Sequence, residues 1–154
     1  MASLKDNIAR IIARGADMTI ATIRPDGWPQ ATTVSYASDG LTIYFGTGAN
    51  AQKARNLAKN NKVSLTINLP YADWNHIEGI SASGIATRII DPAELGRFAE
   101  IMFKKFPQVM SAVPAEGAGE MAMFRVTLNV VSLLDYTKGF GHTDLVDLNL
   151  PAAA

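Results

Sequence analysis

The sequence predicts a mainly β fold, a small antiparallel barrel of about six strands in a single domain with attached helices. Short β-rich segments occupy residues 18–45 and are joined by the turns Pro25-Asp26-Gly27 and Ser38-Asp39-Gly40. Strands joined by such short turns run antiparallel, because parallel neighbours need a crossover of about a dozen residues. The β-rich segment 77–90 contains a cluster of small residues, which is typical of a bend or bulge at a barrel corner.

Hydrophobic periodicity and capping residues place the elements in order. Isoleucines recur at helical spacing near the start of the chain, where Gly15 follows as a stop. Asn50 and Asp91 are expected N-caps, the second with Pro92 at the first helical position. The predicted helices cover residues 3–14, 50–60 and 91–106.

The predicted strands cover residues 18–24, 30–37, 41–45, 63–69, 77–90 and 122–135. Residues 107–119 are rich in Pro, Gly and Ala and are expected to form a loop or a short helix. The tail, residues 136–154, has no clear hydrophobic period. One domain of residues 1–154 accommodates all of these elements.

The composition is that of an ordinary folded protein. Hydrophobic residues make up 48% and charged residues 18% of the 154 residues, which is enough for a buried core. The 14 basic and 14 acidic residues balance, so overall charge gives no support for binding nucleic acid or an anionic membrane. The sequence shows no apolar leader and no apolar run of about 18 residues, so we expect a cytoplasmic protein.

The supply of cysteine and histidine limits the chemistry. Without cysteine there is no disulfide, thiolate metal site or cysteine nucleophile. The two histidines, His76 and His142, lie in separate segments and form no cluster with ligand spacing, so no metal site is predicted. No Ser-His-Asp arrangement is present, and no catalytic residue is assigned.

Residues 46–62 combine a glycine-flanked turn with a basic helix. No acidic residue occurs between Gly40 and Ala72, whereas four basic residues do: Lys53, Arg55, Lys59 and Lys62. A helix N-terminus offers free N–H groups and about half a positive charge, which suits an anion. Thr47 would donate its hydroxyl and Lys53 would supply a charge, so this is a candidate phosphate site. The pattern fits a solvated basic helix face equally well.

A second interpretation of the same glycines is a dinucleotide-binding loop. Residues 46–51 match the G-x-G-x-x-G/A pattern after a strand and before a helix, and Asp73 lies near the expected position of a ribose-binding acid. That loop belongs on the first turn of a parallel sheet. The antiparallel strands predicted ahead of residue 46 therefore disfavour a dinucleotide.

Four segments occur in order along the chain: WPQATTVS at residues 28–35, LTIYFGT at 41–47, KARNL at 53–57 and KVSL at 62–65. Together they resemble the FMN-binding split-barrel superfamily of pyridoxamine 5′-phosphate oxidase-like proteins, nearest its general-stress-protein branch. The resemblance covers about residues 16–90. It implies a six-stranded antiparallel split β-barrel and a homodimer with FMN at the subunit interface.

The resemblance also implies roles for individual residues. By position, Thr47 and Lys53 would hold the FMN phosphate. Thr32, Thr33 and Val34 would lie along the isoalloxazine, mainly through backbone groups. The family's combination of Thr and Lys at this spacing ties the candidate phosphate site to FMN.

Two features depart from the family's pattern. Gln52 stands where the oxidase branch often has an arginine, and it can hydrogen-bond a phosphate but adds no charge. Arg55 or the partner's Arg88 would have to compensate. The segment 135–144 also lacks the Trp- and Arg-containing stretch of true pyridoxamine-phosphate oxidases, so vitamin B6 oxidation is not expected.

The implied function is an FMN-dependent oxidoreductase that moves hydride or electrons between a reduced donor and an unidentified small-molecule acceptor. The alternative is a non-catalytic binding or stress-related protein, and FAD, the deazaflavin F420 or haem are the alternative ligands. His142, beside Phe140, would donate a proton at the flavin or be an ordinary loop residue. Trp28 and Trp74 would cover an aromatic ligand or pack in the core or an interface.

Overall fold

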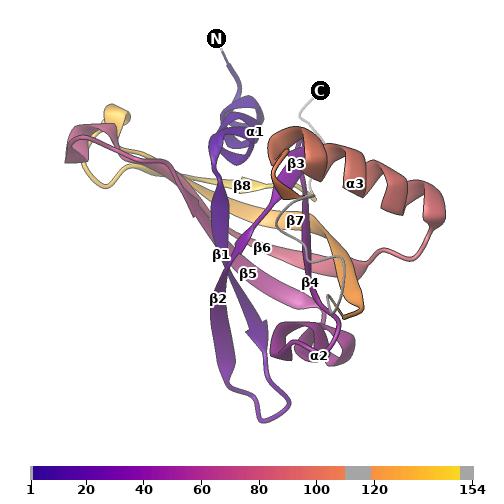
Figure 1. The fold of residues 1–154 in the computed structure, drawn as a ribbon. Helices are drawn as coiled ribbons and strands as arrows, with labels where there is room; N and C mark the ends of the chain where they lie inside the picture. Colours follow the sequence, from indigo (N-terminus) through magenta and orange to yellow (C-terminus); the bar gives the residue numbers. More distant parts are fainter. Residues whose placement is uncertain (1, 110–118, 150–154) are drawn as a thin grey trace.

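The computed structural model describes residues 2–109 and 119–149, which form a curled antiparallel sheet with three α-helices around it (Figure 1). The helices are α1 (Leu4–Arg14), α2 (Gln52–Lys59) and α3 (Pro92–Lys105), with 3-10 turns η1 (Trp74–His76) and η2 (Tyr136–Lys138). The strands are β1 (Asp17–Ile23), β2 (Pro29–Ser35), β3 (Ala37–Asp39), β4 (Thr42–Gly48), β5 (Lys62–Asn68), β6 (Glu78–Arg88), β7 (Met121–Asp135) and β8 (Thr143–Asp147). Most of the predicted loop 107–119 and the end of the tail lie outside the described residues. No helix within the described ranges is long and apolar enough to cross a membrane.

The sheet follows the order β2-β1-β5-β6-β7-β4-β3, and β8 pairs with β7 outside that path. Every strand pairing in the described part of the chain is antiparallel. The sheet curls into a half-barrel, which confirms the predicted split-barrel class (Figure 1). A dinucleotide-binding loop needs parallel strands, so the dinucleotide interpretation of residues 46–51 is wrong.

The described residues form eight strands, two more than the six predicted. The predicted strand 30–37 divides into β2 and β3 at Tyr36, whose fully buried side chain reaches α1. β8 lies in the tail, where no period was apparent. Two of its five residues, Asp144 and Asp147, are acidic; charged residues are common on edge strands, and here they leave a weak hydrophobic signal.

The three N-terminal predicted strands are antiparallel, but they do not form a simple meander. β1 pairs with β2, whereas β4 pairs with β3 and with β7. Where β7 lies beside β4, Phe45 stacks on Phe124 with ring centroids 5.2 Å apart. A distant part of the chain therefore completes the sheet next to β4.

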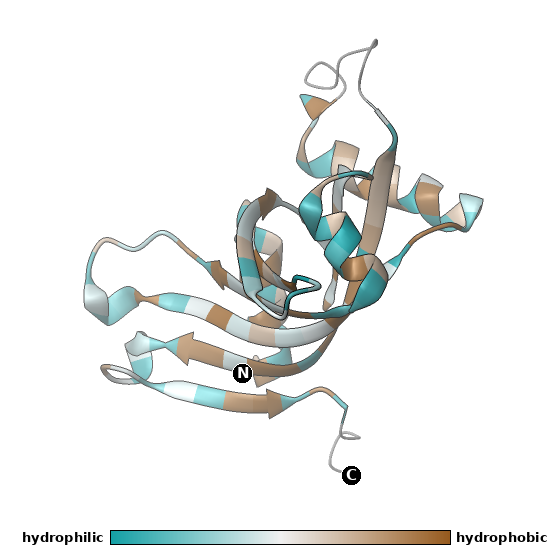
Figure 2. Ribbon diagram, turned by 90° about the horizontal axis from the view of Figure 1, so that it is seen from below, coloured by the Kyte–Doolittle hydropathy of each residue, from teal (hydrophilic) through white to brown (hydrophobic). Residues whose placement is uncertain are grey.

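The cluster of small residues in β6 marks an irregularity, as predicted. The register between β6 and β7 shifts between Ala82 and Gly84. A Cβ atom at Gly84 would lie 2.8 Å from the carbonyl oxygen of Thr127, so a side chain does not fit there. Elsewhere hydrophobic and hydrophilic residues alternate along the strands, which places one face of the sheet in the core (Figure 2).

α1 closes the barrel with an apolar face. Ser3 and Asp6 form a capping box at its start, and its three isoleucines are fully buried. Gly15 ends the helix as predicted, in an extended conformation rather than a left-handed one. Position 15 requires glycine because there is no room for a side chain: a Cβ atom there would lie 2.3 Å from the hydroxyl of Tyr36.

Tyr36→Phe is expected to lower the free energy of unfolding by about 1–2 kcal/mol. The Tyr36 hydroxyl donates a 2.6 Å hydrogen bond to the carbonyl of Ile12. Burial, and secondarily the charge of Asp17, raises the pKa of this hydroxyl, so it stays protonated and can donate. Urea unfolding measures the change, and Tyr71→Phe at an exposed site serves as the control. Equal stability of wild type and Tyr36→Phe would contradict the prediction.

The two helix-cap predictions have different outcomes. Asp91 caps α3 with its side chain and Pro92 occupies the first turn, as predicted. The prediction for Asn50 is wrong, because Ala51 is the N-cap of α2 and no side chain caps it. The backbone N–H of Ala51 donates to the carbonyl of Gly48 instead, so a tight turn leads directly from β4 into α2.

α3 is fixed against β4 and against the end of α1. The ring of Phe98 meets Tyr44 edge-on, with centroids 6.1 Å apart. At the C-terminal end of the helix, Lys105 donates a 2.5 Å hydrogen bond to the carbonyl of Gly15 and lies over the ring of Tyr36. Burial lowers the pKa of Lys105. α3 is thereby held at its middle and at its C-terminal end.

Candidate functional site

Thr47 and Lys53 meet where β4 ends and α2 begins. Thr47 is a buried residue of β4, and Lys53 lies in the first turn of α2. The Nζ atom of Lys53 is 3.4 Å from Oγ1 of Thr47. The tight turn through Gly48 and Ala51 brings the hydroxyl and the ammonium group together.

The N-terminus of α2 is open to an anion. No side chain caps it, and its first turn contains no acidic residue. The N–H groups of a helix's first turn have no partner within the helix, and the helix dipole adds partial positive charge. Within the described ranges none of the four basic residues from Lys53 to Lys62 forms an ion pair. Their charge is therefore uncompensated, as the sequence predicted.

The residues predicted to contact the flavin ring lie on β2, at one edge of the sheet. β1 is the neighbour with which β2 pairs, so the other edge of β2 presents unpaired backbone groups. Thr32 and Val34 are half-buried, and Thr33 is exposed. Oγ1 of Thr32 is buried without a hydrogen-bond partner among the described residues. An unpaired buried hydroxyl is costly, so this atom is an exception among the buried polar groups.

A groove with a volume of about 1430 Å³ runs from β2 to the Thr47–Lys53 pair. Val34 and Ser35 line it on the β2 side. α3 and β7 supply the remaining, mainly apolar lining, which includes Leu95, Phe98, Met102, Phe103, Met121 and Met123. The structure thus brings Val34, Thr47 and Lys53 to one groove. Thr32, Thr33 and Gln52 do not line it.

Asn56 connects α2 to the sheet, and sequence reasoning assigned it no role. Its side chain is fully buried, and Nδ2 donates to Oγ1 of Thr22 at 2.9 Å and to Oε1 of Gln30 at 3.0 Å. Oδ1 accepts a 2.8 Å hydrogen bond from Nε2 of Gln52. Thr22 lies on β1 and Gln30 on β2, so this buried network fixes α2 relative to the strand that carries Val34. The sequence did offer one indication that Asn56 matters, since it belongs to the KARNL segment on which the family resemblance partly rests.

Gln52 and the two candidate arginines already have partners in the chain. Gln52 donates to Asn56 and accepts a 2.7 Å hydrogen bond from Arg55. Arg88 lies 3.7 Å from the carboxylate of Glu120. A contact of Gln52, Arg55 or the partner's Arg88 with phosphate stays a prediction.

Comparison with protein families adds the decisive observation. The model of the family described as pyridoxamine 5′-phosphate oxidase matches residues 4–134. The chain belongs to this pyridoxamine 5′-phosphate oxidase-like family. No curated protein matches its sequence.

Solved structures share the family's fold at low sequence identity. A heme binding protein from Mycobacterium smegmatis is 20% identical, with a TM-score of 0.80 over 96% of this chain and 59% of that one. This chain therefore spans less than two thirds of that protein's length. A conserved hypothetical protein from Mycobacterium tuberculosis is 23% identical, with a TM-score of 0.75 over 97% of this chain and 96% of that one. HutZ, the heme storage protein from Vibrio cholerae, is 16% identical, with a TM-score of 0.67 over 83% and 92%.

In this family member His76 lies in η1 and His142 in the turn between η2 and β8, and η1 packs against η2. This η1–η2 tip lies away from α2 and α3 (Figure 1). Nδ1 of His76 is 2.7 Å from Oδ1 of Asp73, and Nε2 of His142 is 3.0 Å from Oδ2 of Asp144. Hydrogen bonds from these histidines lower the pKa of Asp73 and of Asp144. His142 does not line the groove of its own chain, and its contact with a flavin stays a prediction.

Both tryptophans are on the surface. Trp28 is 68% exposed and Trp74 is 65% exposed, which excludes packing in the core of this chain. Packing in an interface or over an aromatic ligand stays a prediction. Trp28 lies in the turn between β1 and β2 and Trp74 in η1, both away from the interior face of the sheet. Trp74 stacks on Phe140 with ring centroids 5.9 Å apart.

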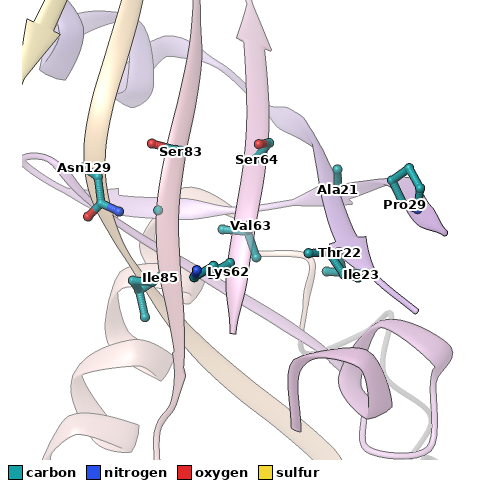
Figure 3. Close-up of a pocket in the computed structure, with 11 residues that line it drawn as sticks. Ala21, Thr22, Ile23, Pro29, Lys62, Val63, Ser64, Ser83, Ile85 and Asn129 are labelled. Carbon is teal, nitrogen blue, oxygen red and sulfur yellow. The ribbon is translucent and has the colours of Figure 1, made fainter. Parts of the chain in front are cut away.

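A second pocket, of about 410 Å³, lies across β1, β5, β6 and β7 (Figure 3). Ser64, Ser83 and Asn129 line it from three neighbouring strands, and Lys62 lines it at the start of β5. It has no helix N-terminus and a single cationic side chain, so we assign no phosphate to it. Within the described ranges no group of three or more His, Cys, Asp or Glu side chains is placed to hold a metal ion.

Proposed function

We propose that this chain binds FMN and uses it as an oxidoreductase, moving hydride or electrons between a reduced donor and a small-molecule acceptor. The observation that carries the proposal is the 3.4 Å approach of Lys53 Nζ to Thr47 Oγ1 at the start of α2. An ammonium group, a hydroxyl and helix N–H groups converge there, and this donor set suits a phosphate. Membership of the pyridoxamine 5′-phosphate oxidase-like family supports a flavin as the molecule that carries it.

Each part of the site has a role in this proposal. Lys53, Thr47 and the first turn of α2 hold the phosphate, with Gln52 beside them. The isoalloxazine lies along residues 32–34, where the open edge of β2 offers backbone hydrogen-bonding groups. Bound FMN supplies hydride and electron transfer at N5, and the chain supplies binding and orientation. Hydride transfer requires no dedicated acid or base, so a site without an assigned catalytic residue is sufficient.

We also propose that the single-domain chain acts as a cytoplasmic homodimer. The second copy would close the open side of the FMN site. The unpaired edge of β2 and the exposed stack of Trp74 on Phe140 are surfaces that such a partner would cover.

Haem is the second candidate ligand, because two of the similar structures are named as heme proteins. A histidine is a common protein ligand of haem iron. No histidine is among the residues that line the groove in the described chain, and both histidines lie at the η1–η2 tip. This placement favours FMN over haem within one chain.

A spectrum of the purified protein with mass identification of the released cofactor tests the proposal. We expect a yellow protein that releases FMN, loses its colour with NAD(P)H without oxygen and regains it in air. Bound FMN that no reductant bleaches would support a non-catalytic binding protein. A haem spectrum, or the mass of FAD or F420, would replace FMN as the ligand. A colourless protein that takes up no added FMN would overturn the proposal.

A further inference from the structure

The groove is larger than one flavin site requires. Small-molecule pockets usually have volumes of roughly 300–1,000 Å³, whereas this groove has about 1430 Å³. Among its lining residues, only Val34, Thr47 and Lys53 belong to the flavin site proposed above. The rest lies between α3 and β7, and we call it the apolar compartment: Leu95, Phe98, Met102, Phe103, Met121 and Met123.

The apolar compartment is adapted to aromatic and conjugated molecules. Methionine side chains are flexible and polarisable, and their sulfur atoms make favourable contacts with aromatic rings. Phenylalanine adds faces and edges for ring stacking. Phe103 is 47% exposed and Met121 is 42% exposed, so these large apolar side chains still present surface to a ligand.

The apolar compartment has no net charge that would attract an ionic ligand. Apart from Lys53 at the phosphate site, the charged lining residues are Glu100 and Lys104, one turn apart on α3. Their charges are opposite and cancel at a distance. An apolar lining without net charge favours an uncharged molecule over a carboxylate or an amine.

We propose that the apolar compartment binds the substrate, and that this substrate is an uncharged, planar, conjugated molecule such as a naphthoquinone. This inference rests on the proposed function in one respect, namely that the flavin fills the other side of the groove. A molecule in the compartment then lies beside the bound ring.

Equilibrium dialysis with menadione, a naphthoquinone, tests the inference on the full chain with and without FMN. The chain has no cysteine, so the quinone cannot react with a protein thiol. We expect saturable binding that Phe103→Glu and Met121→Glu each weaken at least tenfold, because each places a carboxylate beside an apolar ligand. Both side chains are half-exposed, so the substitutions leave the buried core intact. FMN affinity should change less than threefold.

Leu145→Glu is the matched control, since Leu145 is 77% exposed on β8 and does not line the groove. It should keep wild-type affinity for menadione. No saturable menadione binding, or equal binding by all variants, would overturn the inference. If Met121→Glu instead halves the mass in light scattering and wild type binds no menadione, the groove is an interface between copies and the inference is wrong.

FMN titration separates this inference from the proposed function. Lys53→Ala should lose FMN affinity and keep menadione binding in the FMN-free protein. A protein that binds menadione through Phe103 and Met121 but takes up no FMN would uphold the compartment and overturn the proposed flavin function. A protein that binds FMN but no menadione would uphold the proposed flavin site and overturn the inference about the apolar compartment.

Discussion

Lys53→Ala is expected to weaken FMN binding about 10- to 150-fold, or about 1.5–3 kcal/mol. The Nζ atom of Lys53 lies 3.4 Å from the Thr47 hydroxyl, at a helix start that no side chain caps. Its removal takes a charge-assisted hydrogen bond from the phosphate. Quenching of flavin fluorescence on titration measures the dissociation constant.

The control for Lys53→Ala is Lys59→Ala, in the last turn of the same helix. Both variants remove one positive charge from α2, so they alter long-range electrostatics alike. Only Lys53 is placed to touch the phosphate, and Lys59→Ala should therefore change FMN affinity by less than about threefold. Equal effects of the two substitutions would contradict the prediction and indicate that Lys53 is a solvated basic residue.

Asn56→Ala is expected to lower the free energy of unfolding by about 3 kcal/mol. The fully buried amide makes hydrogen bonds to Thr22, Gln30 and Gln52, and its removal leaves these partners unsatisfied. Urea unfolding measures the loss. Asn61→Ala is the control at an exposed site just beyond α2, where a change below about 0.5 kcal/mol is expected.

The same variant also tests the role of the network in positioning the site. Asn56 links α2 to β1 and β2, so its loss should weaken FMN binding even at low temperature, where the variant is folded. Gln30→Ala removes one link from the β2 side and should weaken FMN binding in the same direction. A stability loss below about 1 kcal/mol for Asn56→Ala, with unchanged FMN affinity, would contradict both expectations.

Local patterns in the sequence predicted much of the fold. The turns at Gly27 and Gly40 were recognisable because both glycines adopt positive φ, a conformation that favours glycine. The first helix was recognisable because its isoleucines recur on one face. Asp91 and Pro92 marked the start of α3 for an equally local reason.

The errors concern long-range packing. Nothing within residues 122–135 shows that this segment will pair with both β4 and β6, because that choice depends on side chains far away in sequence. Tyr36 divides a β-rich segment because its hydroxyl bonds to α1, which no local pattern reveals. Asn50 is a favourable cap residue, but the backbone of Ala51 already closes the turn.

In the candidate site, too, the local contacts could be predicted from the sequence and the long-range ones could not. The spacing from Thr47 to Lys53 crosses one short turn, so their proximity could be predicted from the sequence. The apolar compartment could not, because α3 and β7 approach it from separate parts of the chain. Asn56 resembles an exposed residue of a basic helix, and only the tertiary structure buries it.

The position of β7 between β6 and β4 has a consequence for biosynthesis. β4 ends at Gly48 and β6 ends at Arg88, but the strand that joins them begins only at Met121. Until it is synthesised, β4 and β6 each lack the neighbour that it later provides, and unpaired strand edges favour aggregation. Pairings between such distant segments also form slowly. One edge of β4 and one edge of β6 therefore stay unpaired until residues 121–135 have been made.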